Sequence, residues 1–427
     1  MQVSDLTISE LGPKGDGIAQ GAQGRIYVDR ALPGDRIQGR VLRGVDGMQR
    51  AEITKMISPS PYRQKPPCVH YDNCGSCTIQ HLKDEFYRQW KTDLVKDAFR
   101  KQRLSPRQWL PTQFIGKENR RRATFTAQKR RGQLTVGYYR RRSQQIFDLN
   151  SCLIADPKLL GLREAMKPFL NVIVGEGNSL DVFFQLVGGA IDMVLTGPVS
   201  VKGLPDNPVR EAASQFLNSA KIARISWRAS EDDAIRQLAS QGKVIAEFGL
   251  LKVNLPPAAF LQPTLEGESA LTQAVMAALP ARGHFADLFA GCGTFSGPML
   301  ARGTVEAYES VSSSVSALTK AAENERKPLK AFRRDLFRNP LRRDELNRFT
   351  AVVFDPPRAG CPEQAQQMAA SRVPTLIGVS CNPLTFARDA AVLVQGGYRL
   401  QSLQPIDQFL WSHHVEVVGV FTKPLRR

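Results

Sequence analysis

The sequence predicts an α/β protein of several domains, with a doubly wound parallel sheet in its C-terminal part. From Leu251 onward, apolar runs alternate with glycine loops and helical segments, a pattern typical of parallel strands joined by crossover helices. The first 57 residues contain short alternating segments separated by glycine turns, as in a small β-barrel. A tight group of cysteines lies between these regions. We therefore expect domains at residues 1–57, 58–250 and 251–427.

The N-terminal region is expected to form a β-barrel of oligonucleotide-binding type. Segments such as Arg25–Val28 and Arg36–Val41 alternate in polarity and are separated by Gly and Pro-Gly-Asp turns. A fragment of a β-sandwich is the alternative. The prolines of Ser58–Pro67 predict a linker. Apolar residues at helical spacing then predict a helix within Ile79–Arg103, and the rest of the central region alternates strands and helices.

The cysteines favour metal binding or catalysis over disulfides. The chain has seven, an odd number, and its N-terminus lacks a signal peptide. Three of them form a C-x5-C-x2-C group and a fourth lies further along the chain: Cys68, Cys74, Cys77 and Cys152. Four thiolates can hold zinc or a 4Fe–4S cluster. Zinc sites more often contain two C-x2-C pairs, so the spacing favours the iron–sulfur cluster.

The charge distribution favours nucleic acid as a partner. The net charge is +18, and a basic excess of this size suits a polyanion. Basic residues gather between Lys117 and Arg142, including Arg120, Arg121 and Arg122, with Phe125, Tyr138 and Tyr139 between them. Basic side chains bind phosphates and aromatic rings stack on unpaired bases. We expect this segment to bind RNA or another single-stranded nucleic acid, a solvated basic face being the alternative.

No membrane segment is expected. The chain contains no run of eighteen apolar residues, and no basic segment followed by an apolar core opens it. A cytoplasmic protein is therefore predicted.

A glycine loop marks a cofactor site in the C-terminal region. In Asp287–Gly297, Gly291 and Gly293 allow a sharp turn and a close approach to a ligand. Glu309 ends the next predicted strand, where a carboxylate can accept hydrogen bonds from ribose hydroxyls. NAD and S-adenosylmethionine both fit these features. The segment that begins with Asp355 and continues with two prolines favours S-adenosylmethionine, because a rigid turn with a carboxylate suits a planar base beside a sulfonium donor.

A single cysteine follows the fourth predicted strand of this region. Cys381 comes after the apolar run Thr375–Val379, and Asn382-Pro383 ends the strand. Open α/β sheets hold their ligands at this end of the strands. The thiol is therefore either an inert packing group or a nucleophile.

With these motifs, the chain resembles the S-adenosylmethionine-dependent RNA uracil-C5 methyltransferases, in particular the rRNA 5-methyluridine branch with a TRAM domain and a 4Fe–4S cluster. The resemblance covers nearly the whole chain. It implies a class I, Rossmann-like methyltransferase domain after a TRAM-type barrel and a central α+β domain that carries the cluster on Cys68, Cys74, Cys77 and Cys152. It also implies these donor contacts: Gln262 in "AAFLQPT", Phe289, Glu309 and Asp355. Cys381 in "SCNP" matches the nucleophile, and Glu416 in "HHVEVVGVF" matches the base.

Four positions depart from the family pattern or have no role in it. Thr264 and Thr294 replace residues that are usually Asn. Cys292 and Cys361 match no family function, and we expect both to be small buried side chains.

The chemistry of uracil explains why this residue set is needed. Carbon-5 of uracil is a weak nucleophile, but a thiolate that adds to carbon-6 converts the ring to an enolate that can attack the methyl donor. A base then removes the proton from carbon-5, and the thiolate leaves. Arg358 is expected to contact either an RNA phosphate or the edge of the uracil, and His413 and His414 lie beside the expected base. The target uridine has to leave its stack to reach such a site.

The expected function is methylation of a uridine, most simply in 23S rRNA, by a monomeric enzyme. A tRNA uridine methyltransferase is the first alternative. A cytosine methyltransferase would usually carry a second cysteine where Asp355-Pro356-Pro357 stands. An iron–sulfur RNA-binding protein without catalytic activity would not need Cys381 and Glu416.

Overall fold

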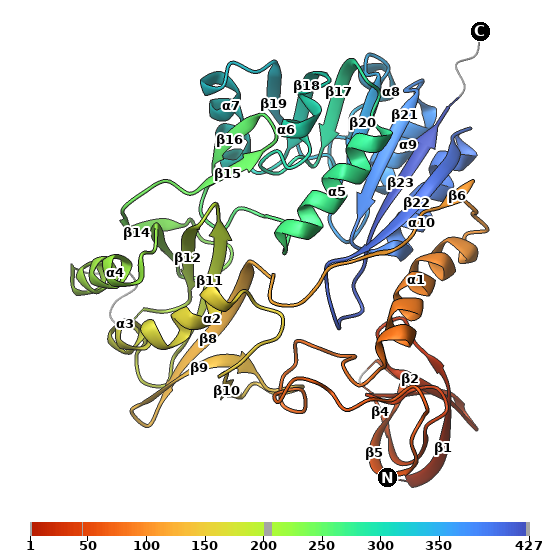
Figure 1. The fold of residues 1–427 in the computed structure, drawn as a ribbon, viewed down its shortest axis with the longest axis vertical. Helices are drawn as coiled ribbons and strands as arrows, with labels where there is room; N and C mark the ends of the chain where they lie inside the picture. The colour runs from red at the N-terminus through yellow and green to blue at the C-terminus, as the bar shows by residue number, and fades with distance from the viewer. Residues whose placement is uncertain (1, 45, 200–206, 424–427) are drawn as a thin grey trace.

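The computed structural model describes residues 2–44, 46–199 and 207–423. Its N-terminal part is a closed barrel with the strand order β1-β2-β3-β5-β4, at the lower right of Figure 1. The strands are β1 (Gln2–Leu11), β2 (Gly17–Gly21), β3 (Gly24–Val28), β4 (Arg36–Arg43) and β5 (Gln49–Ser58). Inward-facing residues such as Leu6, Ile8 and Ile37 form its core. The expected small β-barrel is confirmed.

The helix expected within Ile79–Arg103 is α1 (Asp84–Lys101), but it packs outside the central region. Val95 and Phe99 of α1 lie in one hydrophobic cluster with residues of the C-terminal sheet. The short strands β6 (Gln108–Trp109) and β7 (Gln113–Phe114) pair with the edge strand of that sheet, as Figure 1 shows for β6. The helix α1 therefore belongs to a core of the C-terminal sheet, because its apolar face is buried against strands formed much later in the chain.

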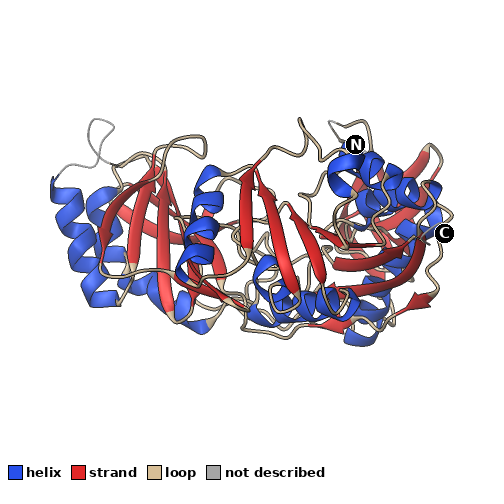
Figure 2. Ribbon diagram, turned by 90° about the horizontal axis from the view of Figure 1, so that it is seen from above, coloured by secondary structure: helices blue, strands red, loops and turns tan. Residues whose placement is uncertain are grey.

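The central region forms a seven-stranded sheet with helices packed on it. Its order is β10-β9-β8-β11-β12-β13-β14. The strands are β8 (Arg122–Arg130), β9 (Gln133–Tyr139), β10 (Ile146–Asp148), β11 (Ser179–Val187), β12 (Ala190–Thr196), β13 (Arg224–Arg228) and β14 (Arg236–Ser240). The helices α2 (Pro157–Ala165), α3 (Lys167–Ile173) and α4 (Asn207–Ala220) contribute Leu159, Phe169 and Phe216 to the shared core. Figure 2 shows this sheet and its helices at one end of the molecule.

The C-terminal sheet has the order β19-β18-β17-β20-β21-β23-β22-β6. Its parallel strands are β17 (Gly283–Leu288), β18 (Gly303–Glu309), β19 (Leu329–Arg333), β20 (Ala351–Phe354) and β21 (Thr375–Ser380). The chain ends with the expected antiparallel pair, β22 (Arg399–Asp407) and β23 (Glu416–Thr422). The doubly wound parallel sheet expected after Leu251 is thus confirmed.

Helices cover both faces of this sheet. Alternate residues of one strand enter different cores, Phe285 on one face and Ala286 on the other, as the two-residue period of a strand requires. One face is covered by α5 (Leu265–Ala278), α6 (Ser296–Met299) and α7 (Ser312–Asn324). The other is covered by α1, α8 (Arg343–Leu346), α9 (Pro362–Ala370) and α10 (Pro383–Gln395).

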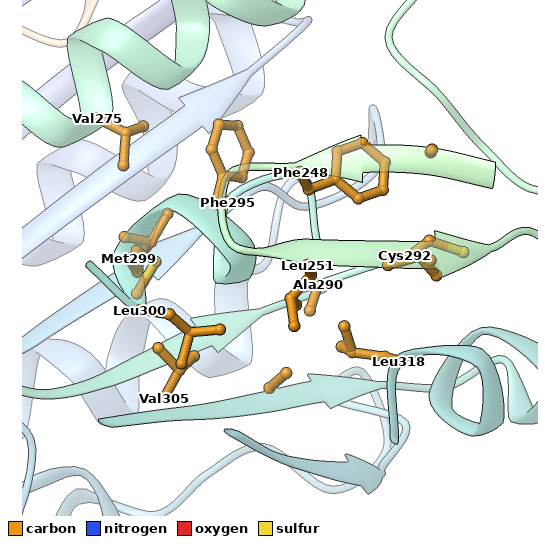
Figure 3. Packing of buried hydrophobic residues seen from close by; sticks show 14 of the residues in the cluster. Phe248, Leu251, Val275, Ala290, Cys292, Phe295, Met299, Leu300, Val305 and Leu318 are labelled. Carbon is orange, nitrogen blue, oxygen red and sulfur yellow. The ribbon is translucent and has the colours of Figure 1, made fainter. Parts of the chain in front are cut away.

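A hairpin that spans the expected boundary at residue 250 closes the first of these cores. It consists of β15 (Ile245–Phe248) and β16 (Leu251–Asn254). Figure 3 shows Phe248 and Leu251 in one cluster with Phe295 and Met299. A Cβ on Gly297 would lie 1.9 Å from the carbonyl oxygen of Phe248, so this glycine is required by close packing.

The two cysteines without an expected role are buried in the cores. Cys292 lies in the cluster of Figure 3, and Cys361 lies in the cluster on the opposite face of the sheet. The expectation that both are small buried side chains is confirmed. In the part of the chain that the structure describes, no helix is long and apolar enough to cross a membrane.

Candidate active site

The register of the C-terminal sheet brings the predicted site residues to one edge. Leu288 pairs with Tyr308 and with Phe354, so the residues that follow, Phe289, Glu309 and Asp355, lie at the carboxyl ends of three neighbouring strands. Cys381 directly follows β21, the next strand along. Parallel strands that end at the same level form such a ligand-binding edge.

The antiparallel strand β23 completes this edge with a carboxylate. Ser380 of β21 pairs with Val417 of β23. Cys381 follows the last residue of β21, and Glu416 is the first residue of the antiparallel strand β23. The thiol and the carboxyl group therefore lie at the same end of adjacent strands.

A single cavity of about 1190 Å³ connects this edge with the cysteines of the central region. All ten residues that the sequence predicted as catalytic, donor-binding or cluster-binding line it: Cys68, Cys74, Cys77, Cys152, Gln262, Phe289, Glu309, Asp355, Cys381 and Glu416. The site is thus built between the central and C-terminal sheets.

The glycine loop and Glu309 form one hydrogen-bonded unit. The backbone N–H of Gly291 donates to Oε2 of Glu309 at 3.0 Å, and the N–H of Val311 donates to Oε1 at 2.8 Å. These bonds fix the carboxylate while lone pairs remain for ribose hydroxyls. Phe289, at the start of the loop, has a φ of 62°, a left-handed conformation that is uncommon for a large side chain. The loop and carboxylate fit a nucleoside-type donor.

Four residues after β19 also line the cavity and were missed from the sequence. They are Arg334, Asp335, Leu336 and Phe337, and the ring of Phe337 lies 5.6 Å from the ring of Phe289. The strand that positions them, β19, is short and mostly accessible, so it lacks the apolar run that identified its neighbours. Its parallel pairing with β18 becomes visible only in the assembled sheet.

The thiol of Cys381 is half-buried among charged groups. Burial raises its pKa to about 11, the nearby Glu416 and Asp355 carboxyls contribute to the rise, and Arg358 opposes it. Asn382 accepts a hydrogen bond from the N–H of Leu384 at the start of α10 and donates one to the carbonyl of Arg358 at 3.0 Å. Asn382 therefore caps the helix and holds the arginine loop beside the thiol.

Glu416 is a buried carboxyl group with a raised pKa. It is 4% exposed, and burial together with the neighbouring Asp355 raises its pKa to about 8. Burial also raises the pKa of Asp355, to about 7. Arg358 lies near this carboxyl and 2.6 Å from Nε2 of His414.

The comparisons with known proteins agree with this chemistry. The family model for tRNA (uracil-5-)-methyltransferases matches residues 257–424. An uncharacterized RNA methyltransferase of Brucella melitensis is 36% identical over 99% of this chain and 98% of its own. The chain belongs to the S-adenosylmethionine-dependent RNA uracil-C5 methyltransferases. This RNA uracil-C5 methyltransferase is also 29% identical to the 23S rRNA (uracil(1939)-C(5))-methyltransferase of Chromohalobacter salexigens, over 99% of this chain and 90% of that protein.

The methyltransferase shares its fold with a solved structure over almost its full length. The tRNA (uracil-54, C5)-methyltransferase of Pyrococcus abyssi, in complex with S-adenosyl-L-homocysteine, superimposes with a TM-score of 0.76. That likeness covers 98% of this chain and 99% of the other at 21% identity.

A buried ion pair supports the loop that precedes Glu416. Nζ of Lys91 lies 2.7 Å from Oδ1 of Asp407, and the two side chains are 0% and 1% exposed. Lys91 also donates to the carbonyl of His414, and the hydroxyl of Tyr87 donates to Asp407. Two side chains of α1 in the methyltransferase therefore hold the loop between β22 and β23 in place. Sequence reasoning missed this pair because its members are 316 positions apart.

The four cysteines of the central region are free thiols around one end of the cavity. Cys68 and Cys77 each lie within electrostatic range of Cys74 and Cys152. Backbone N–H groups point at two of the sulfurs, from Ser76 to Cys74 at 3.5 Å and from Ala155 to Cys152 at 3.4 Å. Over residues 2–44, 46–199 and 207–423, no group of three or more His, Cys, Asp or Glu side chains has the spacing of a formed metal site. Four thiols at one end of the cavity, two of them with N–H donors at the sulfur, nevertheless fit a sulfur-ligated cluster.

The basic segment is divided between structural and accessible residues. Arg121 is buried, where it pairs with Glu268 at 2.5 Å and donates to the carbonyl of Gln262. Phe125 is fully buried in the central core. The expectation that these two residues contact RNA is wrong, because Arg121, just before β8, is buried against Glu268 and Phe125 of β8 faces the central core. Other members of the segment line the cavity: Arg120, Arg122, Tyr138, Tyr139 and Arg140.

Proposed function

We propose that the methyltransferase converts a uridine of 23S rRNA to 5-methyluridine through a covalent adduct with Cys381. The observation that carries the proposal is the position of Cys381 opposite Glu416 on adjacent strands, at the edge that also holds Glu309 and Asp355. A nucleophile, a base and a donor site in one cavity are the three elements that carbon-5 methylation needs.

In the proposed reaction, Sγ of Cys381 forms a bond to carbon-6 of the flipped uracil, and the ring becomes an enolate. Before the attack the thiol of Cys381 loses its proton to water, and Arg358 stabilises the resulting thiolate. Carbon-5 then takes the methyl group from the sulfonium of S-adenosylmethionine, and S-adenosylhomocysteine leaves. Glu416 accepts the proton of carbon-5, the bond between carbon-6 and sulfur breaks, and the double bond of the product returns.

Four residues of the cavity bind the methyl donor in the same proposal. Glu309 binds the ribose hydroxyls, Phe289 packs against the donor, and Gln262 and Asp355 contact it and the uracil. The residues after β19 line the cavity next to Phe289 and contact the adenine of the donor.

The choice of rRNA rests on the relative that acts on uracil-1939 of 23S rRNA, which is more similar to this chain than the tRNA enzyme of known structure. The alternative is a tRNA uridine. Nucleoside mapping of both RNAs from a strain lacking this gene separates them. Loss of a single 5-methyluridine from 23S rRNA supports the proposal, and loss from tRNA alone contradicts it.

We further propose that Cys68, Cys74, Cys77 and Cys152 hold a 4Fe–4S cluster, which would join the loop after the linker to the central sheet. Anaerobically purified protein is then expected to contain about four irons and about four acid-labile sulfides. Cys74→Ser should lower the iron content and the stability, since a cluster held by distant residues contributes to folding. Metal analysis and the visible absorbance of the cluster measure this.

A cysteine outside the group provides the control. Cys292→Ser changes a buried thiol in the same way and should leave the iron content unchanged. Stoichiometric zinc without acid-labile sulfide would contradict the cluster.

The accessible arginines at the cavity are expected to bind RNA phosphates. The double variant Arg120→Ala/Arg140→Ala should weaken RNA binding and reduce the slope of log affinity against log salt by about 0.7 for each phosphate that is no longer bound. Affinity for S-adenosylhomocysteine should not change. Filter binding of an rRNA fragment at several salt concentrations measures the slope.

Two arginines at the end of the C-terminal sheet opposite the cavity make a matched control. Arg372 and Arg399 are exposed and lie before β21 and at the start of β22, away from the cavity. Arg372→Ala/Arg399→Ala removes the same charge and should leave the slope nearly unchanged. Equal effects of the two double variants would mean that only the net charge matters.

A further inference from the structure

A buried amide side chain joins the donor side of the cavity to its catalytic side. Gln408 begins the loop after β22 and is 4% exposed. Its Nε2 donates to Oε1 of Gln262 at 2.7 Å and to Oε1 of Glu416 at 3.1 Å. Gln262 is 146 positions away in the chain. One amide therefore contacts both the residue assigned to the donor and the residue assigned to the base.

The hydrogen-bonding capacity of these groups determines their orientation. Both N–H groups of the Gln408 amide are used by the two acceptors. Its Oε1 faces Oγ1 of Thr264 at 3.4 Å. Thr264 accepts from the N–H of Gly267 as the cap of α5, so its own hydroxyl hydrogen is free to be donated to Gln408. The residue that departs from the family pattern thus holds the amide in place.

Two consequences follow for the site. The side-chain oxygen Oε1 of Gln262 accepts from Gln408, so the side-chain N–H donors of Gln262 point away from Gln408. Oε1 of Glu416 accepts a hydrogen bond from the same amide, which fixes the orientation of the carboxyl group and leaves its other lone pairs available to accept a proton.

The first turn of α5 is shaped around this amide. A Cβ on Gly267 would lie 2.2 Å from Oε1 of Gln408 and 2.6 Å from Oγ1 of Thr264. Gly267 has a helical conformation, so the absence of a side chain here is a requirement of space.

We propose that Gln408 is a positioning residue that couples the methyl-donor site to the base, by orienting Gln262 and the carboxyl group of Glu416 through one amide. The inference rests on the proposed roles of Gln262 and Glu416. It adds that donor affinity and proton removal depend on a residue that touches neither the donor nor the uracil.

Gln408→Met tests the coupling, because methionine keeps the size of the side chain but cannot donate. The affinity for S-adenosylhomocysteine is expected to fall about 5- to 10-fold, as for the loss of one buried hydrogen bond. Calorimetric titration with S-adenosylhomocysteine, without RNA, measures this. In a Gln262→Ala background the same change should have little further effect, because the coupling runs through that side chain.

The second measurement is the pH profile of product release in single turnovers. The bond from Gln408 lowers the pKa of Glu416, so its loss should move the profile to higher pH. The other charged groups around this carboxyl are Asp355, Arg358, Lys91 and Cys381, and all remain in the variant. A role limited to folding would lower yield or melting temperature without moving the profile.

A second variant perturbs the amide without changing any polar group. Gly267→Ala should displace Gln408 and reproduce both effects. Gly161→Ala in α2 is the matched control, because a Cβ there meets nothing within 4 Å, and it should leave affinity and profile unchanged.

The outcomes separate this inference from the proposed function. Unchanged affinity and pH profile in Gln408→Met, with a protein in which Glu416→Gln still traps the RNA adduct, would overturn the coupling and leave the function intact. If Glu416→Gln instead turns over normally, the proposed role of the base fails, and with it the coupling.

Discussion

Cys381→Ala is expected to form neither methylated RNA nor a covalent RNA adduct. Without the thiolate, carbon-6 receives no nucleophile and carbon-5 stays unreactive toward the methyl donor. Removal of a catalytic nucleophile lowers the rate on the order of 10⁶-fold in well-studied cases, so no product should be detectable. Labelled S-adenosylmethionine and a uridine-containing rRNA fragment, analysed by denaturing electrophoresis, report both quantities.

The control for this variant is Cys361→Ala. Cys361 is buried in a core cluster and does not line the cavity, so its replacement should reduce stability modestly and leave adduct formation intact. Donor affinity should be similar in both variants, since neither residue is assigned to the donor. Methylation by Cys381→Ala would refute the covalent mechanism as a whole.

Glu416→Gln is expected to accumulate a methylated RNA that remains attached to the protein. Cys381 can still add to carbon-6 and the methyl group can still be transferred, but the carbon-5 proton has no acceptor and elimination cannot follow. The adduct should survive denaturing electrophoresis and carry the labelled methyl group, whereas the wild-type protein should show far less of it.

Glu306→Gln makes the same chemical change in a carboxyl group of β18 that does not line the cavity, and it should not trap RNA. Turnover of Glu416→Gln at the wild-type rate would exclude Glu416 as the base and direct attention to Asp355.

The pH dependence follows from the same residue. Burial and Asp355 raise the pKa of Glu416 to about 8, and the base has to be ionised to accept a proton. Product release in single turnovers should therefore increase as the pH rises through about 8 and level off above it. In the Glu416→Gln variant, the release of product from the adduct should not increase with pH over this range.

Much of the site could be predicted because it depends on local sequence. Short motifs at the ends of predicted parallel strands have to meet at one sheet edge, since the strands run in the same direction. Phe289, Glu309, Asp355 and Cys381 are of this kind. The cysteine group was likewise visible from spacing, and all four of its members line the cavity.

Other features depend on which surfaces pack together. The sequence predicts one RNA-binding surface between Lys117 and Arg142, yet Arg121 is buried in an ion pair with Glu268. Whether a basic side chain is buried depends on the surface that packs against it, and a run of charges in the sequence does not reveal that surface. Proximity in the sequence predicts that α1 packs with the central region, whereas its apolar face is buried against the C-terminal sheet.

The sequence alone determined the succession of strands along the C-terminal region, the glycine loop, the cysteine group and the candidate nucleophile, because each is encoded within a few consecutive residues. Only the tertiary structure decided that β23 lies between β21 and β22, which brings Glu416 to the level of Cys381. The same holds for the contacts of Lys91 with Asp407 and of Gln408 with Gln262. These polar groups lie far apart in the chain, and they pair because a buried charge or amide is stable only with a partner that the assembled fold supplies.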